Sequence, residues 1–161
     1  PFCLVMRKWL LDTAAKQRDI KVHDGGTYVC MEGPAFSTRA ESNMHRQWGG
    51  DLIGMTCMPE AKLAREAEIA YALVALPTDY DCWRPHELGQ TPQALLQEII
   101  GNLKRGNSIA LIEAALQNID LLKATPSPAH SALALAIWSD KSHISEPDRP
   151  RLDVLWGRYF K

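Results

Sequence analysis

The pattern of apolar and polar positions along the chain alternates between helix-like and strand-like segments. Apolar residues recur at helical spacing in residues 4–18 and predict an amphipathic helix. Residues 27–31 and 51–55 are short apolar stretches, and residues 70–76 form a longer one, so three strands are predicted. Because strands alternate with helices, the pattern predicts an α/β fold with parallel strands.

Further helices are predicted at residues 38–48, 60–69, 91–124 and 131–138. Thr38 and Glu41 have the spacing of a capping box, in which each side chain satisfies the other residue's free backbone amide. Thr91 followed by Pro92 is a typical helix start. Pro126 ends the long helix that begins there.

The chain of 161 residues is long enough for one domain with its own core. We expect residues 1–138 to form part of one domain and residues 139–161 to form a polar C-terminal tail. The chain begins at Pro1 without an initiator methionine, so we expect it to be a piece of a longer protein.

Composition and charge exclude several classes of partner. The 18 basic and 19 acidic residues leave a net charge of −1, so neither nucleic acid nor an anionic membrane is indicated. The apolar runs are shorter than the roughly 20 residues of a membrane helix. The four cysteines have neither metal-site spacing nor a secretory context and predict reduced thiols in a cytoplasmic protein. No metal site is predicted.

Polar residues follow each predicted strand, at residues 32–37, 55–57 and 78–83. In α/β sheets ligands collect at the carboxyl ends of strands, so these three segments are expected to meet. Asp79 and Asp81 are unusual there, because a carboxylate removed from water needs a partner. The alternative is a surface turn with two solvated aspartates.

The residues at these strand ends carry a family resemblance. EGPAFSTRAE (residues 32–41), GMTCMPEAKLAREAEI (residues 54–69) and TDYDCW (residues 78–83) are similar to the methylthioadenosine phosphorylases. Those enzymes are trimeric members of the purine nucleoside phosphorylase family. The resemblance implies the C-terminal part of a three-layer α/β domain, with a mixed sheet flanked by helices. The family's glycine-rich phosphate loop and an Arg–His pair lie upstream of the matching segments.

The resemblance also implies an activity. It indicates a pentosyltransferase that cleaves S-methyl-5′-thioadenosine by phosphorolysis to adenine and 5-methylthioribose 1-phosphate. Inorganic phosphate is the co-substrate, and no cofactor is implied. The expected partners are the N-terminal part of the same enzyme and two further copies in a homotrimer, and the chain alone is expected to be inactive. The alternatives are another purine nucleoside phosphorylase, acting on adenosine or 6-oxopurines, and a non-catalytic nucleoside-binding remnant.

The resemblance implies that Asp79 is the catalytic acid. A proton given to N7 of adenine stabilises the departing base, which gains negative charge. Asp81 accepts from the 6-amino group or orients Asp79, and Thr78 belongs to the same base contacts. Members that act on 6-oxopurines carry asparagine in place of Asp79, since an amide can donate to O6.

The other site residues follow from the resemblance in the same way. Phe36 stacks near the base, and Ser37 replaces a glutamate of the 6-oxopurine enzymes. Met55 packs on the ribose with Ile53 close by, and the Thr56 hydroxyl contacts phosphate. Met55 could equally be a core residue, and Ser37 could serve only next to the helix cap.

Three residues of the long helix are implied to line the pocket for the 5′ group, namely Pro92, Leu95 and Leu96. Apolar side chains would suit a methylthio group. Most family members carry an aliphatic residue at the position of Pro92, so proline is a departure. The alternative is an ordinary first-turn proline followed by core leucines.

Overall fold

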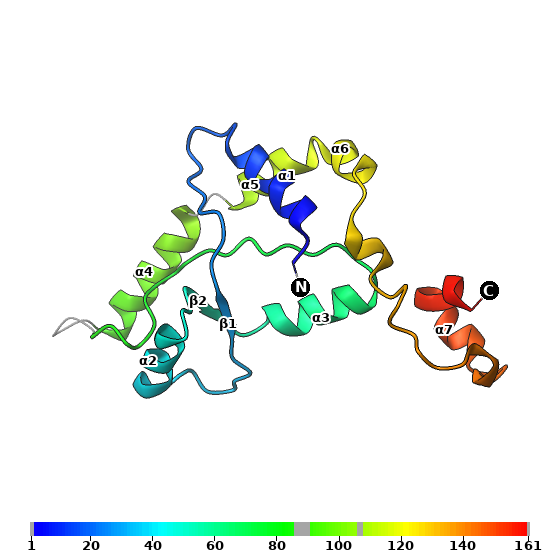
Figure 1. The fold of residues 1–161 in the computed structure, drawn as a ribbon. Helices are drawn as coiled ribbons and strands as arrows, with labels where there is room; N and C mark the ends of the chain where they lie inside the picture. Colours follow the sequence, from blue (N-terminus) through cyan, green and yellow to red (C-terminus); the bar gives the residue numbers. More distant parts are fainter. Residues whose placement is uncertain (1, 86–90, 106–107, 161) are drawn as a thin grey trace.

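A computed structural model describes residues 2–85, 91–105 and 108–160 of the chain. Within those residues the sheet has two parallel strands, β1 (Tyr28–Cys30) and β2 (Leu52–Gly54), which pair in register along their whole length. Helix α2 (Arg39–Gln47) forms the crossover between them (Figure 1). The strands predicted at residues 27–31 and 51–55 and the intervening helix are therefore confirmed.

The start of α2 has the capping box predicted from the sequence. The Thr38 side chain accepts from the Glu41 amide, and the Glu41 carboxylate accepts from the Thr38 amide at 2.7 Å. Hydrogen bonds from the Thr38 amide and hydroxyl hold the pKa of Glu41 below its ordinary value. The helix stops at Gly49, whose φ of +81° is a backbone conformation that glycine adopts easily.

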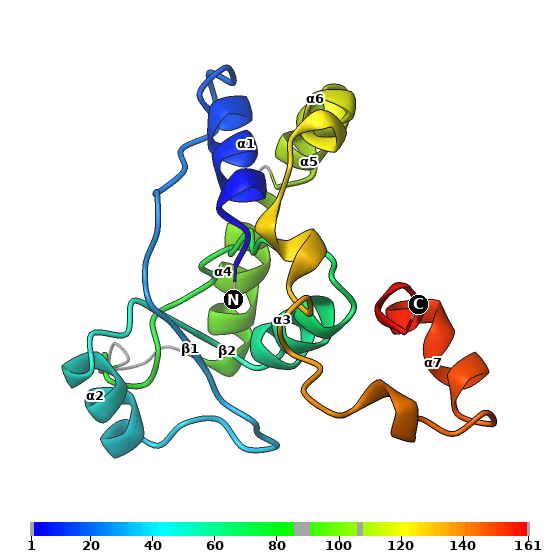
Figure 2. The ribbon, with the colours of Figure 1, turned by 45° about the vertical axis from the view of Figure 1, so that its right-hand side comes forward.

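The helices lie on both sides of an extended central segment (Figures 1 and 2). Helix α1 (Leu4–Ala14) packs against α5 (Ser108–Leu116) and α6 (Ile119–Ala124) on one side. Helix α3 (Cys57–Glu66) follows β2 on the other side. The order of helices and strands is that of an α/β protein.

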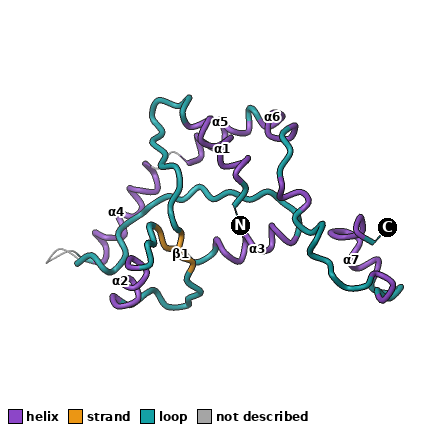
Figure 3. The backbone as a smooth tube through the Cα atoms, in the orientation of Figure 1, coloured by secondary structure: helices purple, strands orange, loops and turns teal. Residues whose placement is uncertain are grey.

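Residues 70–76 do not form the predicted strand. They run as an extended chain from the end of α3 back toward α2 (Figures 1 and 3). A strand is stabilised by hydrogen bonds to a neighbouring strand, and the sheet of the described residues consists of β1 and β2 without this segment. A backbone hydrogen bond connects this segment to the start of the chain, since the Tyr71 carbonyl accepts from the Cys3 amide at 2.7 Å.

The long helix predicted at residues 91–124 is three helices instead. Helix α4 (Pro92–Arg105) begins as predicted, because the Thr91 hydroxyl accepts from the Ala94 amide and caps it. Residues 106–107, between α4 and α5, lie outside the described residues. The second break is at Asn118, whose φ of −115° and ψ of 24° are not helical.

The prediction of a helix at residues 131–138 is also wrong. A short 3₁₀ helix, η1 (Pro128–Ser131), is followed by turns. This segment has the apolar spacing of a helix, but its Leu135 and Trp138 side chains are 88% and 90% exposed and add little packing. Packing of an apolar face supplies most of the stability of a short helix in a protein.

Residues 139–161, predicted as a polar tail, contain helices and contact the end of α3. They contain η2 (Lys141–His143), α7 (Arg149–Trp156) and η3 (Gly157–Tyr159). The Trp156 indole donates to the Glu66 carbonyl at 3.3 Å, and Arg158 forms an ion pair with Glu68. The Glu68 carboxylate also accepts from the Leu133 amide at 3.0 Å, so one carboxylate binds two later segments.

The core of the described residues is small, and much apolar surface is open. Its buried apolar residues are mainly small ones, namely Cys3, Ala14, Cys57, Ala61, Leu111, Ala115 and Ala129. The accessible surface is 12190 Å². A compact monomer of 18.0 kDa would have about 8,000 Å². The described part of the chain therefore exposes more surface than a compact domain of this mass, and part of that surface is apolar.

Replacing Gly54 by alanine should destabilise the sheet by about 1–3 kcal/mol, as overpacking typically does. A Cβ atom on Gly54 would lie 1.7 Å from the Tyr28 hydroxyl oxygen and 2.7 Å from the ring carbon that carries it. The free energy of unfolding from urea titrations measures the effect. In a Tyr28→Ala background the penalty should shrink, since the clashing ring is gone; an unchanged penalty would contradict this explanation.

Candidate active site

The loop that follows β1 lies against the end of β2. The Met31 amide donates to the Gly54 carbonyl at 2.9 Å and extends the pairing of the two strands. Gly33 has a φ of +71°, and a Cβ atom there would lie 2.3 Å from the terminal methyl of Met55. Met55 therefore packs directly on the backbone of this loop. The Ser37 hydroxyl lies 3.5 Å from the Met31 sulfur, and Phe36 is 83% exposed.

The turn from β2 into α3 carries the predicted ribose and phosphate residues. Ile53 and Met55 are half-buried, and Thr56 is exposed at the N-cap position of α3. The Thr56 side chain makes no capping hydrogen bond, so capping does not occupy its hydroxyl. The start of a helix carries free amide groups and a partial positive charge, which favour an anion.

The two aspartates of the third segment have different surroundings. Asp79 is exposed, and its carboxylate accepts from the Thr78 hydroxyl at 2.5 Å. Asp81 is half-buried and accepts from the Ser42 hydroxyl at 2.5 Å and from the Cys82 amide at 2.9 Å. The alternative of a surface turn with two solvated aspartates fits the exposed Asp79, whereas the half-buried Asp81 has two hydrogen-bond partners from the protein.

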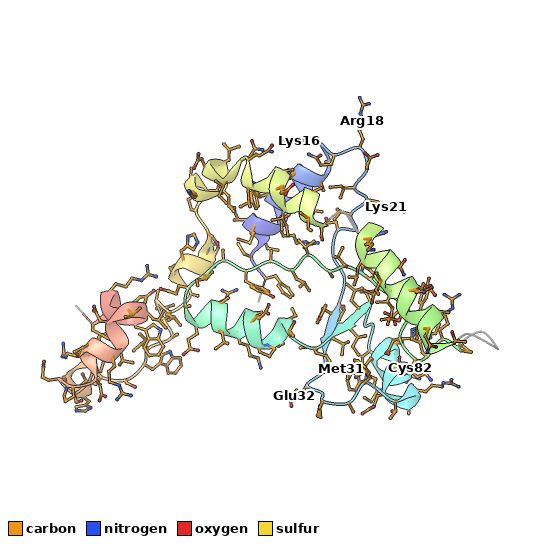
Figure 4. All side chains as sticks on the ribbon, turned by 180° about the vertical axis from the view of Figure 1, so that it is seen from behind. Lys16, Arg18, Lys21, Met31, Glu32 and Cys82 are labelled. Carbon is orange, nitrogen blue, oxygen red and sulfur yellow. The ribbon has the colours of Figure 1, made fainter. Side chains whose placement is uncertain are left out.

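The first and third segments are in direct contact. The Cys82 thiol donates to the Ser37 carbonyl at 3.1 Å. Cys82, Met31 and Glu32 lie in the same region, below the strands in Figure 4, whereas Lys16, Arg18 and Lys21 lie in the segment that follows α1 at the top of the view. Residues 32–37 thus contact both other segments, with Gly33 against Met55 and the Ser37 carbonyl bound to Cys82. We call residues 32–37, 55–57 and 78–83 the strand-end site.

The sequence reasoning missed the residues that bind the 78–83 segment to its neighbours. On α2, the Arg39 side chain donates to the Cys82 carbonyl at 3.3 Å, and the Arg46 guanidinium lies 3.9 Å from the centre of the Trp83 ring. On α4, the Asn102 side chain donates to the Thr78 carbonyl. Arg39 and Arg46 could have been identified from the sequence, because residues seven positions apart lie on the same face of a helix.

The residues predicted for the 5′ pocket lie on α4. Leu95 is half-buried and Leu96 is 56% exposed. Leu95 and Asn102 are about two helical turns apart and share a face, so Leu95 lies on the side that contacts the 78–83 segment. The side chain of Pro92 lies outside the described residues.

Helix α3 also carries Glu60, which is exposed and bonded to the half-buried Tyr71, and the buried Cys57. The Tyr71 hydroxyl donates to the Glu60 carboxylate at 2.6 Å. Burial and this hydrogen bond raise the pKa of Tyr71 well above its ordinary value. Burial also raises the pKa of the Cys57 thiol, with Cys30 nearby adding to the effect. Cys57 is therefore a neutral thiol at pH 7 and a packing residue of the site.

The described residues contain no group of three or more His, Cys, Asp or Glu side chains that could hold a metal ion. Of the helices in residues 2–85, 91–105 and 108–160, none combines the length and the apolar character that a membrane crossing requires. The four cysteines are free thiols.

The sequence profile of the phosphorylase superfamily matches residues 1–116. The chain belongs to the phosphorylase superfamily. Superfamily relatives match almost the whole chain. The S-methyl-5′-thioadenosine phosphorylase of Geobacter sulfurreducens is 48% identical over 92% of this chain and 51% of its own length. The enzyme of the same name from Thermosynechococcus vestitus is 46% identical over 99% of this chain and 55% of its own length. The similarity to these relatives therefore includes the C-terminal residues of the chain as well.

Solved superfamily structures have the same fold. A methylthioadenosine phosphorylase from an antarctic soil metagenomic library superposes with a TM-score of 0.81 at 42% identity, over 96% of this chain and 54% of that one. The Schistosoma mansoni methylthioadenosine phosphorylase in complex with adenine has a TM-score of 0.59 at 32% identity, over 77% of this chain and 51% of that one. The predicted α/β nucleoside-phosphorylase fold is confirmed. The chain spans about half the length of the curated relatives it matches.

Proposed function

We propose that this chain is the C-terminal part of an S-methyl-5′-thioadenosine phosphorylase, a pentosyltransferase that releases adenine and 5-methylthioribose 1-phosphate. The observation that carries the proposal is that residues 32–37 contact both other segments of the strand-end site, with the Cys82 thiol on the Ser37 carbonyl and Met55 against Gly33. Relatives of this name at 48% and 46% identity support it. Inorganic phosphate is the co-substrate, and the reaction needs no cofactor.

The two aspartates have separate roles in this proposal. Asp79 is the general acid that gives a proton to N7 of adenine as the bond to the ribose breaks. The breaking is dissociative, and phosphate attacks the anomeric carbon. Asp81 accepts from the 6-amino group of the base. The hydrogen bonds that hold Asp81 in place support its role as the acceptor.

The remaining residues of the strand-end site bind the other parts of the substrates. Phe36 lies against the base, and Ser37 leaves room for a 6-amino group. Met55 and Ile53 face the ribose, and a thioether is a soft surface for a sugar. The Thr56 hydroxyl, which is not used for capping, binds phosphate beside the first turn of α3.

We further propose that an N-terminal part of the same enzyme completes the domain, and that three copies form a trimer. The chain with that N-terminal part is called the assembled enzyme below. The large exposed apolar side chains, for example Ile109 at 72% and Leu121 at 68%, support a covering partner. The four free thiols support a cytoplasmic location.

The direct test is an assay of the assembled enzyme with phosphate and methylthioadenosine. We expect adenine and 5-methylthioribose 1-phosphate in equal amounts, and no reaction when phosphate is left out. Cleavage that is independent of phosphate would mean a hydrolase. Adenine binding without any cleavage would mean a non-catalytic nucleoside-binding protein.

Replacing Leu95 by serine should lower the preference for methylthioadenosine over adenosine by roughly 10-fold or more, because a lost methyl-sized contact costs about 1–3 kcal/mol. The 5′-hydroxyl of adenosine can bond the new serine and should lose less. The measurement is the ratio of kcat/KM for the two substrates. Leu96→Ser is measured in parallel, and a selective loss there instead would mean that Leu96, the more exposed residue of the pair, touches the 5′ group. Equal losses for both substrates in Leu95→Ser would make Leu95 a core residue.

A further inference from the structure

One face of α2 is joined to the segment that carries the two aspartates. Arg39, Ser42 and Arg46 lie three and four residues apart and share this face. Arg39 binds the Cys82 carbonyl, Ser42 binds the Asp81 carboxylate, and Arg46 covers the Trp83 ring. Arg39 and Arg46 are exposed, whereas Ser42 is 1% exposed. Ser42 is thus the buried member of this face, and its hydroxyl contacts a residue of the strand-end site.

Only one of the two hydrogen bonds to Asp81 can fix its carboxylate relative to another part of the fold. The Cys82 amide, at 2.9 Å from Oδ1, belongs to the next residue and moves together with Asp81. The Ser42 hydroxyl, at 2.5 Å from Oδ2, belongs to a capped helix 39 residues away. A carboxylate has about four acceptor positions, so both bonds still leave room for a donor from a ligand.

We propose that Ser42 is a positioning residue that fixes the Asp81 carboxylate so that its free acceptor positions meet the 6-amino group of the purine. The proposal rests on the proposed function, in which Asp81 accepts from that group. Without the Ser42 hydroxyl, Asp81 keeps the bond to its own neighbour and loses the bond that orients it relative to α2. Ser42 touches no substrate atom in this scheme and acts through Asp81.

A buried serine that only fills space would behave differently. Its loss would loosen α2 and the whole strand-end site, and it would slow every substrate by a similar factor. The distinguishing measurement is therefore the comparison of methylthioadenosine with its analogue that carries hydrogen in place of the 6-amino group. The analogue keeps N7, the ribose and the methylthio group.

The first experiment is Ser42→Ala in the assembled enzyme. We expect kcat/KM for methylthioadenosine to fall about 10- to 100-fold, the range for hydrogen bonds to charged groups, and kcat/KM for the analogue to fall less than about 3-fold. Ser42→Cys, which keeps a weak donor, should lie between wild type and Ser42→Ala. It also serves if the alanine variant folds poorly. Ser127→Ala is the matched control, because Ser127 is half-buried and bonded to the Ala129 amide outside the strand-end site.

The second experiment repeats Ser42→Ala in an Asp81→Ala background. If Ser42 acts through Asp81, the added substitution should change kcat/KM by less than about 3-fold, since coupled residues are not additive. Equal losses for the two substrates, or full additivity with Asp81→Ala, would overturn the inference while leaving the proposed function intact. Failure of the unmodified assembled enzyme to cleave methylthioadenosine would overturn the proposed function and the inference with it.

Discussion

Asp79→Asn in the assembled enzyme should lower kcat/KM for methylthioadenosine by about 10²–10⁴-fold, the usual contribution of a general acid. An amide cannot give a proton to N7 of the departing adenine. It can donate to O6 of a 6-oxopurine, so the loss with inosine should be much smaller. The measurement is kcat/KM for methylthioadenosine and for inosine in the wild type and the variant.

A control variant separates this effect from a general loss of charge. Asp120 lies on α6, its side chain is 95% exposed, and its partner is the surface residue Lys123. Asp120→Asn should therefore leave both substrates within about 2-fold, because exposed ion pairs contribute little. If Asp79→Asn leaves the ratio of the two substrates unchanged, Asp79 does not protonate the base.

This chain produced alone should turn over methylthioadenosine at least about 10³-fold more slowly than the assembled enzyme. The resemblance puts the glycine-rich phosphate loop and the Arg–His pair in the N-terminal part. Loss of even one group that stabilises developing charge lowers the rate by about 10²–10³-fold. The assay uses the 161-residue polypeptide with phosphate and methylthioadenosine.

Adding the N-terminal part, produced separately, should restore turnover. The exposed apolar side chains on α5 and α6 would then be covered, so binding of a dye that reports apolar surface should fall at the same ratio of the two parts. Normal turnover by the chain alone would refute the prediction. If the two parts together bind adenine but do not turn over substrate, the missing catalytic groups are in neither part.

Features set by neighbouring residues were predictable from the sequence. The capping box of Thr38 and Glu41, the start of α4 at Thr91, and the strands β1 and β2 all appear where the pattern put them. Each depends on contacts or spacing within a few residues of chain. That residues 32–37 and 55–57 lie together was predictable too, because the parallel strands β1 and β2 bring their carboxyl ends to one edge.

The errors have a common physical origin. Residues 70–76 have the apolar run of a buried strand, but backbone pairing needs a neighbouring strand, and β1 and β2 pair with each other. Residues 131–138 have the spacing of a helix, yet the exposed side chains of Trp138 and Leu135 add little packing. Apolar spacing predicts a tendency, and only packing and pairing turn it into a strand or helix.

By itself the sequence determined which chemical groups the chain can offer, and roughly where. It put Asp79, Asp81, Met55 and Thr56 after predicted strands, and the resemblance of their segments to the methylthioadenosine phosphorylases implied a purine nucleoside site. The tertiary structure decided which of these side chains form hydrogen bonds with residues from distant parts of the chain. Asp81 is bound by Ser42, which is 39 residues away in the chain. A hydrogen bond between distant segments depends on how α2 packs on the 78–83 segment, and no local pattern encodes that geometry.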